Sequence, residues 1–247
     1  MSLIRALGME FLKGKSRLRF DSDLHADLIK SGIFVVVDGE GEELYIEFVC
    51  PLIRRAFMYV AFPPEFQEPY PSNNNLYQFV KDCLRQFRTK SFSETLSIFP
   101  ETNFPESKFN VEFFYVARKL LGTRGKIDPE VGKVFLIDVE SKSPAVDFYI
   151  NGDLKWAIEL MVEGDRLREH LGRFRSEGKY IAIPRSDHII VDFRKVHTEN
   201  LATQTRKTPF VNENDKYLQV RYLSDFKKLY LRYGNESTVD IIELLEE

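Results

Sequence analysis

The chain has 247 residues, of which 43% are hydrophobic and 30% charged, and its formal net charge is −3. This composition is typical of a globular protein with a sizeable core in one or two domains. The slightly negative charge argues against a strongly basic nucleic-acid binder, although the acids of a metal site can offset local basic patches in a nuclease. Two cysteines form neither a disulfide framework nor a metal-ligand pattern. The charged, broken apolar start is a poor signal peptide, and no apolar run approaches the ~18 residues of a membrane span, so we expect an intracellular protein without a membrane partner.

Residues 1–62 are predicted to form a winged-helix-like module. A helix from Asp21 or Ser22 through Ile29 can end at Gly32, and a hairpin follows around residues 38–41. A second helix runs from Pro51 to about Ala61. Arg54 and Arg55 on that helix suggest DNA docking, but a packing module with a solvated arginine pair is the favoured interpretation.

Residues 63–104 are predicted to form a linker and a helix. The stretch 63–72 is rich in proline, and apolar residues at helical spacing predict a helix over about 75–87. Short elements and turns fill 91–104. The chain's 21 Phe and 11 Tyr residues indicate core packing first, with base-stacking platforms as the alternative.

Residues 105–200 predict an α/β domain. A helix between Pro105 and Gly122 is followed by a strand at 131–140, a hairpin at 146–161 and a helix from Gly164 to about Ser176. Two more strands are expected at 179–184 and 188–194. In the tail, 201–247, we expect edge strands at 205–211 and 217–223 and an acidic helix at 237–247.

The hairpin at 146–161 carries the most informative residues of the chain. Asp147 lies on its first strand and Glu159 on its second, and the turn Asn151-Gly152-Asp153 is typical of two-residue hairpin turns. Pairing outward from that turn brings both carboxylates to one end. Their neighbours are apolar, and a carboxylate in such surroundings is costly unless it is paired or bound to metal. The pair therefore predicts a site for Mg²⁺ or Mn²⁺, with the carbonyl of Leu160 as a third oxygen ligand. Two strand-edge acids facing solvent are the alternative.

This hairpin resembles the core of restriction-endonuclease-like nucleases, in which an Asp and a Glu-x-Lys hold Mg²⁺. Met161 occupies the position of the lysine. Arg166, His170 and Arg173 share one face of the following helix and are candidates for a migrated catalytic cation. An ordinary solvated helix face is the alternative.

Further side chains are weaker candidates for the same site. They are the cations Lys155 and Lys179, and the acids Glu106 and Glu112, which could reach the metal through water. Glu112 shares its helix with an apolar stripe and is expected at the surface.

Ordered motifs over residues 25–195 resemble the C-terminal region of Crinkler-type proteins of fungi and oomycetes. They are GIFVVVDGEGEELYIEFVCPLIRRAFMYVAFPP, PESKFNVEFF, VDFYINGDLKWAIELMVEGD, EHLGRF and HIIVDFR. The resemblance implies a restriction-endonuclease-like domain of the PD-(D/E)xK superfamily. Asp147 and Glu159 take its acidic positions, and Glu106 is its helix acid. Many members of this branch also lack the lysine.

The resemblance also implies a function. Crinkler-type proteins are secreted effectors that act in host nuclei, so the expected partners are nucleic acid, DNA in preference to RNA, or host proteins. The chain has no phosphate-binding motif of the form G-x-x-x-x-G-K-[ST], and a nucleotide cofactor is not expected. We therefore expect a metal-dependent or degenerate nuclease site, with a non-catalytic nucleic-acid- or protein-binding module as the alternative. An intact site should hold the two carboxylates within about 6 Å and should gain activity from Met161→Lys.

Overall fold

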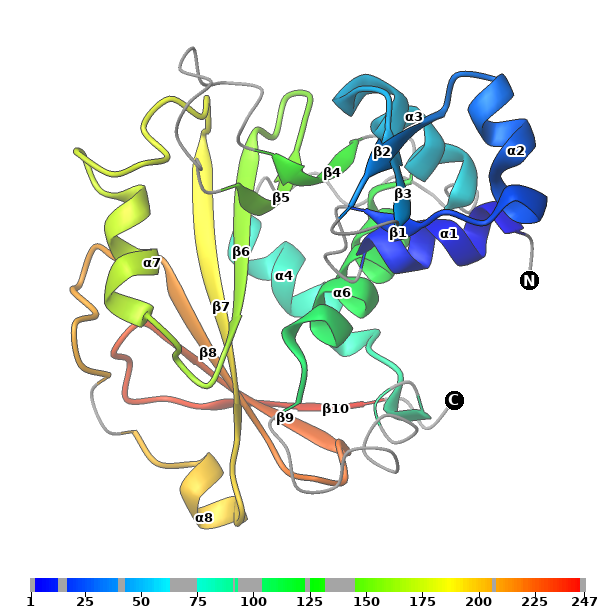
Figure 1. The fold of residues 1–247 in the computed structure, drawn as a ribbon. Helices are drawn as coiled ribbons and strands as arrows, with labels where there is room; N and C mark the ends of the chain where they lie inside the picture. The colour runs from blue at the N-terminus through cyan, green and yellow to red at the C-terminus, as the bar shows by residue number, and fades with distance from the viewer. Residues whose placement is uncertain are drawn as a thin grey trace. The chain divides into compact units, whose positions relative to one another are not determined.

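The computed structural model describes residues 3–12, 17–39, 43–62, 75–90, 92, 104–122, 125–131, 145–205 and 208–244. The chain divides into two compact units, Met1–Phe66 and Gln67–Glu247. Both contain helices and a sheet, so the expected α/β class is confirmed at this level (Figure 1). The predicted linker at 63–72 lies outside the described residues.

Unit 1 combines three helices with a small antiparallel sheet. Its elements are α1 (Leu3–Leu12), β1 (Leu18–Arg19), α2 (Ser22–Lys30), β2 (Phe34–Asp38), β3 (Leu44–Phe48) and α3 (Pro51–Ala61). The strands lie in the order β1-β3-β2. The predicted helix, hairpin and helix are confirmed, because Asp21 caps α2 through its side chain and Pro51 begins α3. Helix α1 and strand β1 were not predicted.

Phenylalanines form the core of unit 1. The ring of Phe11 lies 5.7 Å from that of Phe34 and 4.5 Å from that of Phe48, and Phe57 lies 5.6 Å from Phe34. These separations are typical of packed aromatic pairs. Core packing therefore accounts for these phenylalanines.

Unit 2 is built on a seven-stranded mixed sheet in the order β10-β9-β8-β7-β6-β5-β4. The central strands β6, β7 and β8 are parallel, and the outer pairs are antiparallel. The strands are β4 (Ile127–Val131), β5 (Val146–Ile150), β6 (Trp156–Val162), β7 (Asp187–Lys195), β8 (Tyr217–Tyr222), β9 (Lys228–Tyr233) and β10 (Asp240–Glu243). The helices are α4 (Leu76–Arg85), α6 (Glu106–Leu121), α7 (Leu167–Phe174) and α8 (Glu199–Ala202).

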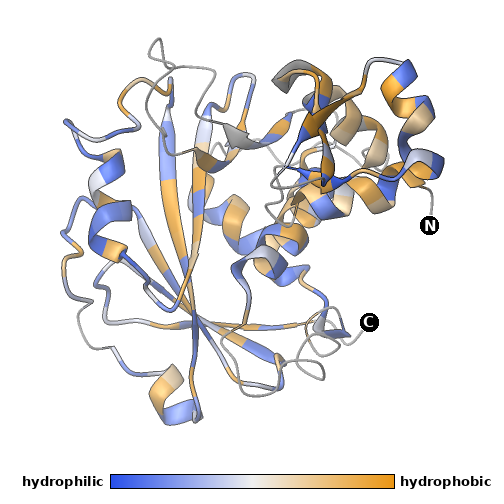
Figure 2. Ribbon diagram, viewed as in Figure 1, coloured by the Kyte–Doolittle hydropathy of each residue, from blue (hydrophilic) through white to orange (hydrophobic). Residues whose placement is uncertain are grey.

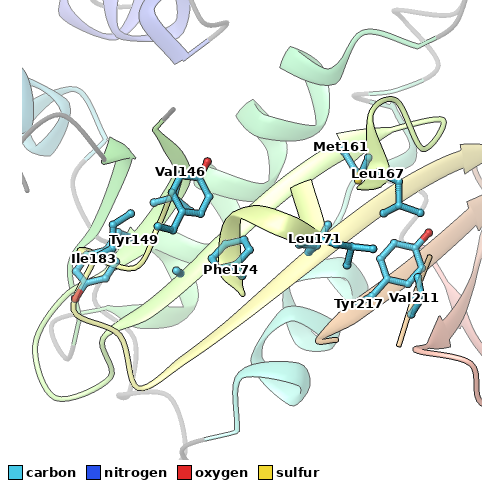
Figure 3. Packing of buried hydrophobic residues seen from close by; sticks show 12 residues of the cluster. Val146, Tyr149, Met161, Leu167, Leu171, Phe174, Ile183, Val211 and Tyr217 are labelled. Atoms are coloured by element: carbon cyan, nitrogen blue, oxygen red, sulfur yellow. The ribbon is translucent and has the colours of Figure 1, made fainter. Parts of the chain in front are cut away.

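Helices α4 and α6 pack on one face of this sheet and α7 on the other (Figure 1). The middle of β6 and β7 is strongly hydrophobic, as Figure 2 shows. The face under α7 holds an apolar cluster with several members labelled in Figure 3. Its members are Val146, Tyr149, Ala157, Met161, Leu167, Leu171, Phe174, Tyr180, Ile183, Ile190, Val211 and Tyr217.

The hairpin and the helices of the second predicted domain are confirmed, with changes at their ends. The turn between β5 and β6 spans 151–155, so a two-residue turn is wrong; Gly152 and Lys155 both have positive φ. Helix α6 begins after Pro105 and ends at Gly122, as expected. Most of the predicted strand at 131–140 lies outside the described residues.

Four expectations for short segments are wrong. Residues 179–184 form turns, closed by hydrogen bonds such as that from the Ile183 amide to the Tyr180 carbonyl. The described part of 205–211 also contains turns, and β8 lies inside the sheet between β7 and β9. The expected terminal helix is replaced by β10, which pairs with β9. Strands β9 and β4 were not predicted.

Candidate functional site

The register of the β5–β6 hairpin places Asp147 and Glu159 on the same face of the sheet. Phe148 pairs with Ile158, so the next positions along the two strands are Asp147 and Glu159. The Phe148 ring packs 5.4 Å from Phe113 of α6. Because neighbouring residues of a strand point to opposite faces, Asp147 belongs to the α7 face. Glu159 contacts α7 directly.

The carboxylate of Asp147 is fixed next to Glu159. Its Oδ2 accepts a hydrogen bond of 2.7 Å from the backbone amide of Leu160. Asp147 therefore contacts β6 through its side chain at the position immediately after Glu159. The expected separation of about 6 Å between the two carboxylates stays a prediction.

Glu159 is the most unusual charged residue of the site. It is only 1% exposed, and its Oε1 lies 2.5 Å from Nη1 of Arg173 and 2.6 Å from Nδ1 of His170. Its Oε2 is buried without a hydrogen-bond partner. A buried carboxylate oxygen without a donor is costly, so this atom keeps an unused capacity to accept a hydrogen bond or to bind a cation.

A buried polar network fixes the turn that leads into α7. Gly164 has positive φ, and its amide donates to Oδ1 of Asp192 at 2.9 Å. Oδ2 of Asp192 accepts from Nε of Arg194 at 2.7 Å and from the hydroxyl of Tyr217 at 2.5 Å. A Cβ at position 164 would clash with the Arg194 guanidinium. This network therefore positions the helix that carries His170 and Arg173.

Arg173 connects several groups of the site. Its Nη2 donates to Glu169 at 2.9 Å, and its Nη1 lies 3.4 Å from the hydroxyl of Tyr180. Burial opposes its charge, but the hydrogen bond to Glu169 and the negative charge of Glu159 raise the pKa of the Arg173 guanidinium. Arg173 is therefore a permanent cation next to the Glu159 carboxylate.

Tyr180 belongs to the site, although it was not predicted there. Burial, followed by the charge of Glu159, raises the pKa of the Tyr180 phenol, and its hydroxyl donates to the carbonyl of Ala145 at 2.9 Å. It thereby links the start of β5 to the Arg173 side of the site. No local pattern distinguishes this tyrosine from a core residue.

Only two of the three candidate cations reach the carboxylates. His170 and Arg173 contact Glu159 as expected, whereas exposed Arg166 pairs with Asp165 at 3.3 Å. Met161 is buried in the apolar cluster under α7. The positive charge near Glu159 therefore comes from α7 and not from position 161 of β6, where the nuclease motif has its lysine.

The two candidate acids of α6 differ in their surroundings. Exposed Glu106 begins α6; desolvation by the surrounding protein and the charge of Glu159 raise its pKa, while His170 and Arg166 oppose that rise. Glu106 therefore responds electrostatically to the site. Glu112 was expected at the surface, which is wrong, because it is buried and pairs with Arg88 at 3.0 Å.

The donor set suits a metal that takes few protein ligands. In the described part of the chain, no group of three or more His, Cys, Asp or Glu side chains is arranged to hold a metal ion. Mg²⁺, however, is commonly held by one or two carboxylates together with water and substrate phosphates. Asp147 and Oε2 of Glu159, which has no hydrogen-bond partner, supply two such carboxylates.

Comparisons with known proteins identify no family for this chain. No family model, no curated protein and no solved structure matches this chain. Within the described residues, no helix is both long enough and apolar enough to cross a membrane.

Proposed function

We propose that unit 2 is a restriction-endonuclease-like, nucleic-acid-directed domain related to the Crinkler-type proteins, with a metal-dependent phosphodiesterase site under α7. The observation that carries the proposal is Glu159, a buried carboxylate with one oxygen in contact with Arg173 and His170 and the other without a hydrogen-bond partner. Such an arrangement is costly for folding alone. Buried charged groups with specific charged partners concentrate at functional sites.

The order of elements supports the same proposal. An α-helix, α6, precedes the antiparallel strands β4, β5 and β6, and α7 leads from β6 to the parallel strand β7. The two acids lie on neighbouring strands of that meander, and Glu106 begins the preceding helix. For unit 1, the helices and the three-stranded antiparallel sheet support a winged-helix-like module.

The residues of the site have separable roles in this proposal. Asp147, Glu159, the carbonyl of Leu160 and, through water, Glu106 would hold Mg²⁺ or Mn²⁺. When bound, the ion polarises the phosphate and lowers the pKa of a water molecule. Arg173 stabilises the negative charge that develops on the phosphate during attack. A proton on Nδ1 of His170 satisfies Glu159 and leaves Nε2 as a proton acceptor toward the substrate.

A second candidate function is a non-catalytic module that binds nucleic acid, DNA in preference to RNA, or a host protein. One observation favours it: Arg173 already neutralises Glu159. A site in this state needs no metal to keep its charge balanced. The chemistry would then be lost while the fold and its basic helix are kept.

Cleavage of labelled DNA and RNA with Mg²⁺ or Mn²⁺, and with chelator, separates the two candidates. We expect metal-dependent cleavage that is abolished by Asp147→Ala and by Glu159→Ala, since each removes a hard oxygen ligand. Asp153→Ala, at the exposed turn of the same hairpin, is the matched control and should cleave normally. Cleavage that survives both substitutions, or no cleavage by the unaltered protein, would refute the catalytic proposal.

A further inference from the structure

Phe210 is an exposed aromatic residue in a conformation that phenylalanine rarely adopts. Its side chain is 60% exposed, and its φ is +69°. A left-handed backbone is unfavourable for a residue with a bulky side chain, and it persists only where the surrounding structure enforces it. Residues strained in this way concentrate at functional sites and ligand clamps.

The turn around Phe210 is held firmly on both sides. Oδ1 of Asn235 accepts from the Thr208 amide at 2.9 Å, and Nδ2 of Asn235 donates to the Val211 carbonyl at 2.9 Å. Nη2 of Arg175 donates to the carbonyl of Phe210 itself at 3.3 Å. Val211 is anchored in the apolar cluster under α7 (Figure 3). The fixed turn therefore presents the Phe210 ring to solvent.

A cationic helix flank lies next to the ring. The guanidinium of exposed Arg168 lies 5.8 Å from the centre of the Phe210 ring, and no carboxylate of the described residues pairs with it. Arg175, which follows the last residue of α7, pairs with Asp215 at 2.9 Å. An exposed aromatic ring next to a guanidinium that has no carboxylate partner among the described residues is a combination with which proteins bind single-stranded nucleic acids: the ring stacks on a base and the guanidinium binds a phosphate.

This ring and the Glu159 site lie on opposite flanks of α7. At 100° per residue, Arg168 falls on one side of the buried stripe of the helix, and His170 and Arg173 fall on the other. The width of one helix with its side chains, about 10–12 Å, separates the two flanks. A single strand that reaches the carboxylates would therefore lie across α7.

We propose that Phe210 and Arg168 bind an unpaired nucleotide, with the base stacked on the ring and a backbone phosphate on the guanidinium. This deepens the proposed function, on which it rests, because it names single-stranded nucleic acid as the substrate class. Stacking on an aromatic side chain is tolerant of base identity. The platform therefore prefers unpaired over paired strands and discriminates little among bases.

Fluorescence anisotropy in chelator tests this proposal without interference from cleavage. The probes are a labelled thymidine oligonucleotide and a duplex of the same length. Phe210→Gly removes the ring and relaxes the positive φ, so backbone strain cannot cause it to misfold. We expect it to weaken binding of the single strand about 5- to 150-fold, the range for loss of one stacked base. Phe210→Tyr should retain the affinity.

The matched control is Ile181→Ala, which truncates a side chain that is 65% exposed in the same unit. It should leave affinity unchanged. The proposal is overturned if Phe210→Gly binds the single strand as tightly as the unaltered protein does. It is also overturned if Ile181→Ala weakens that binding as much as Phe210→Gly does. Failure of the unaltered protein to bind the oligonucleotide overturns it as well, a result that would leave the ring to a protein partner. Loss of cleavage with intact ring-dependent binding would instead refute only the catalytic proposal.

Discussion

The two faces of the seven-stranded sheet are built from alternate residues of the same strands and differ in chemistry. On the face under α4 and α6, Phe79 lies 5.6 Å from Trp156 and Phe109 lies 4.0 Å from Phe193, and packing is aromatic. On the face under α7, Glu159 is buried among apolar residues. Both faces bury apolar side chains, but the α7 face also buries Glu159 with the charged side chain that contacts it.

The largest loss of unfolding free energy is expected for a substitution on the aromatic face, under α4 and α6. Phe109→Ala removes a fully buried ring and should lower the free energy of unfolding by about 3–5 kcal/mol, as for other buried phenylalanines. Urea denaturation measures it. The exposed Ile181→Ala should stay within about 0.5 kcal/mol of the unaltered protein. A small effect of Phe109→Ala would mean that this face does not carry the stability.

On the α7 face, substitutions of Arg173 and Glu159 should have strongly coupled effects on the free energy of unfolding. Arg173→Met leaves the buried Glu159 with only His170 and should cost about 3 kcal/mol, the lower end for breaking a buried ion pair. Adding Glu159→Leu should restore most of that loss, because an apolar pair replaces the buried ion pair. Urea denaturation of the two single variants and the double variant gives the coupling energy in a double-mutant cycle. A double variant no more stable than Arg173→Met would show that the two residues do not stabilise the fold as a pair.

Burial of Met161 changes the expectation for Met161→Lys. The residue is 1% exposed in the apolar cluster, and its neighbour across the sheet is Asp192, which already binds Arg194 and Tyr217. A lysine there should cost about 2 kcal/mol in unfolding free energy and should not raise cleavage. An increased cleavage rate would show that Arg173 does not supply the missing charge.

A pH effect on the α7 face should be smaller. Burial, with the nearby charge of Arg185, lowers the pKa of His188 to about 4, and its ring stacks 4.4 Å from Phe174. The unfolded chain therefore binds more protons between about pH 6.5 and 4, so stability that is present above pH 6.5 is lost as the pH falls. We expect His188 to account for about 1–3 kcal/mol of that loss.

Urea denaturation of His188→Gln over the same pH range checks this assignment. The variant should show a flatter pH dependence, while His197→Gln, at an exposed position, should keep the original one. An unchanged slope for His188→Gln would contradict the assignment.

Much of this organisation can be predicted from local signals. The helix between Pro105 and Gly122 and the hairpin at 146–161 have both the right periodicity and clear boundaries, and the register then puts Asp147 and Glu159 together. Helical spacing also predicts that His170 and Arg173 lie on the same face of α7. It fails for Arg166, which has φ of 50° and precedes the first helical residue.

The remaining differences come from non-local contacts. Strand β10 exists because it pairs with β9, and an apolar-acidic run of this length does not distinguish strand from helix. Glu112 is buried because Arg88, 24 residues away, neutralises it. The role of Tyr180 depends on Ala145, which no local pattern reveals.

The most direct test of the proposed metal site on the α7 face is calorimetric titration of Mn²⁺ into the full chain and into Asp147→Asn. The substitution keeps the shape of the side chain and removes one hard anionic ligand. We predict a saturable heat of binding for the unaltered protein that is lost or strongly weakened in Asp147→Asn. No binding by the unaltered protein, or equal binding by both, would contradict a metal site at Asp147 and Glu159.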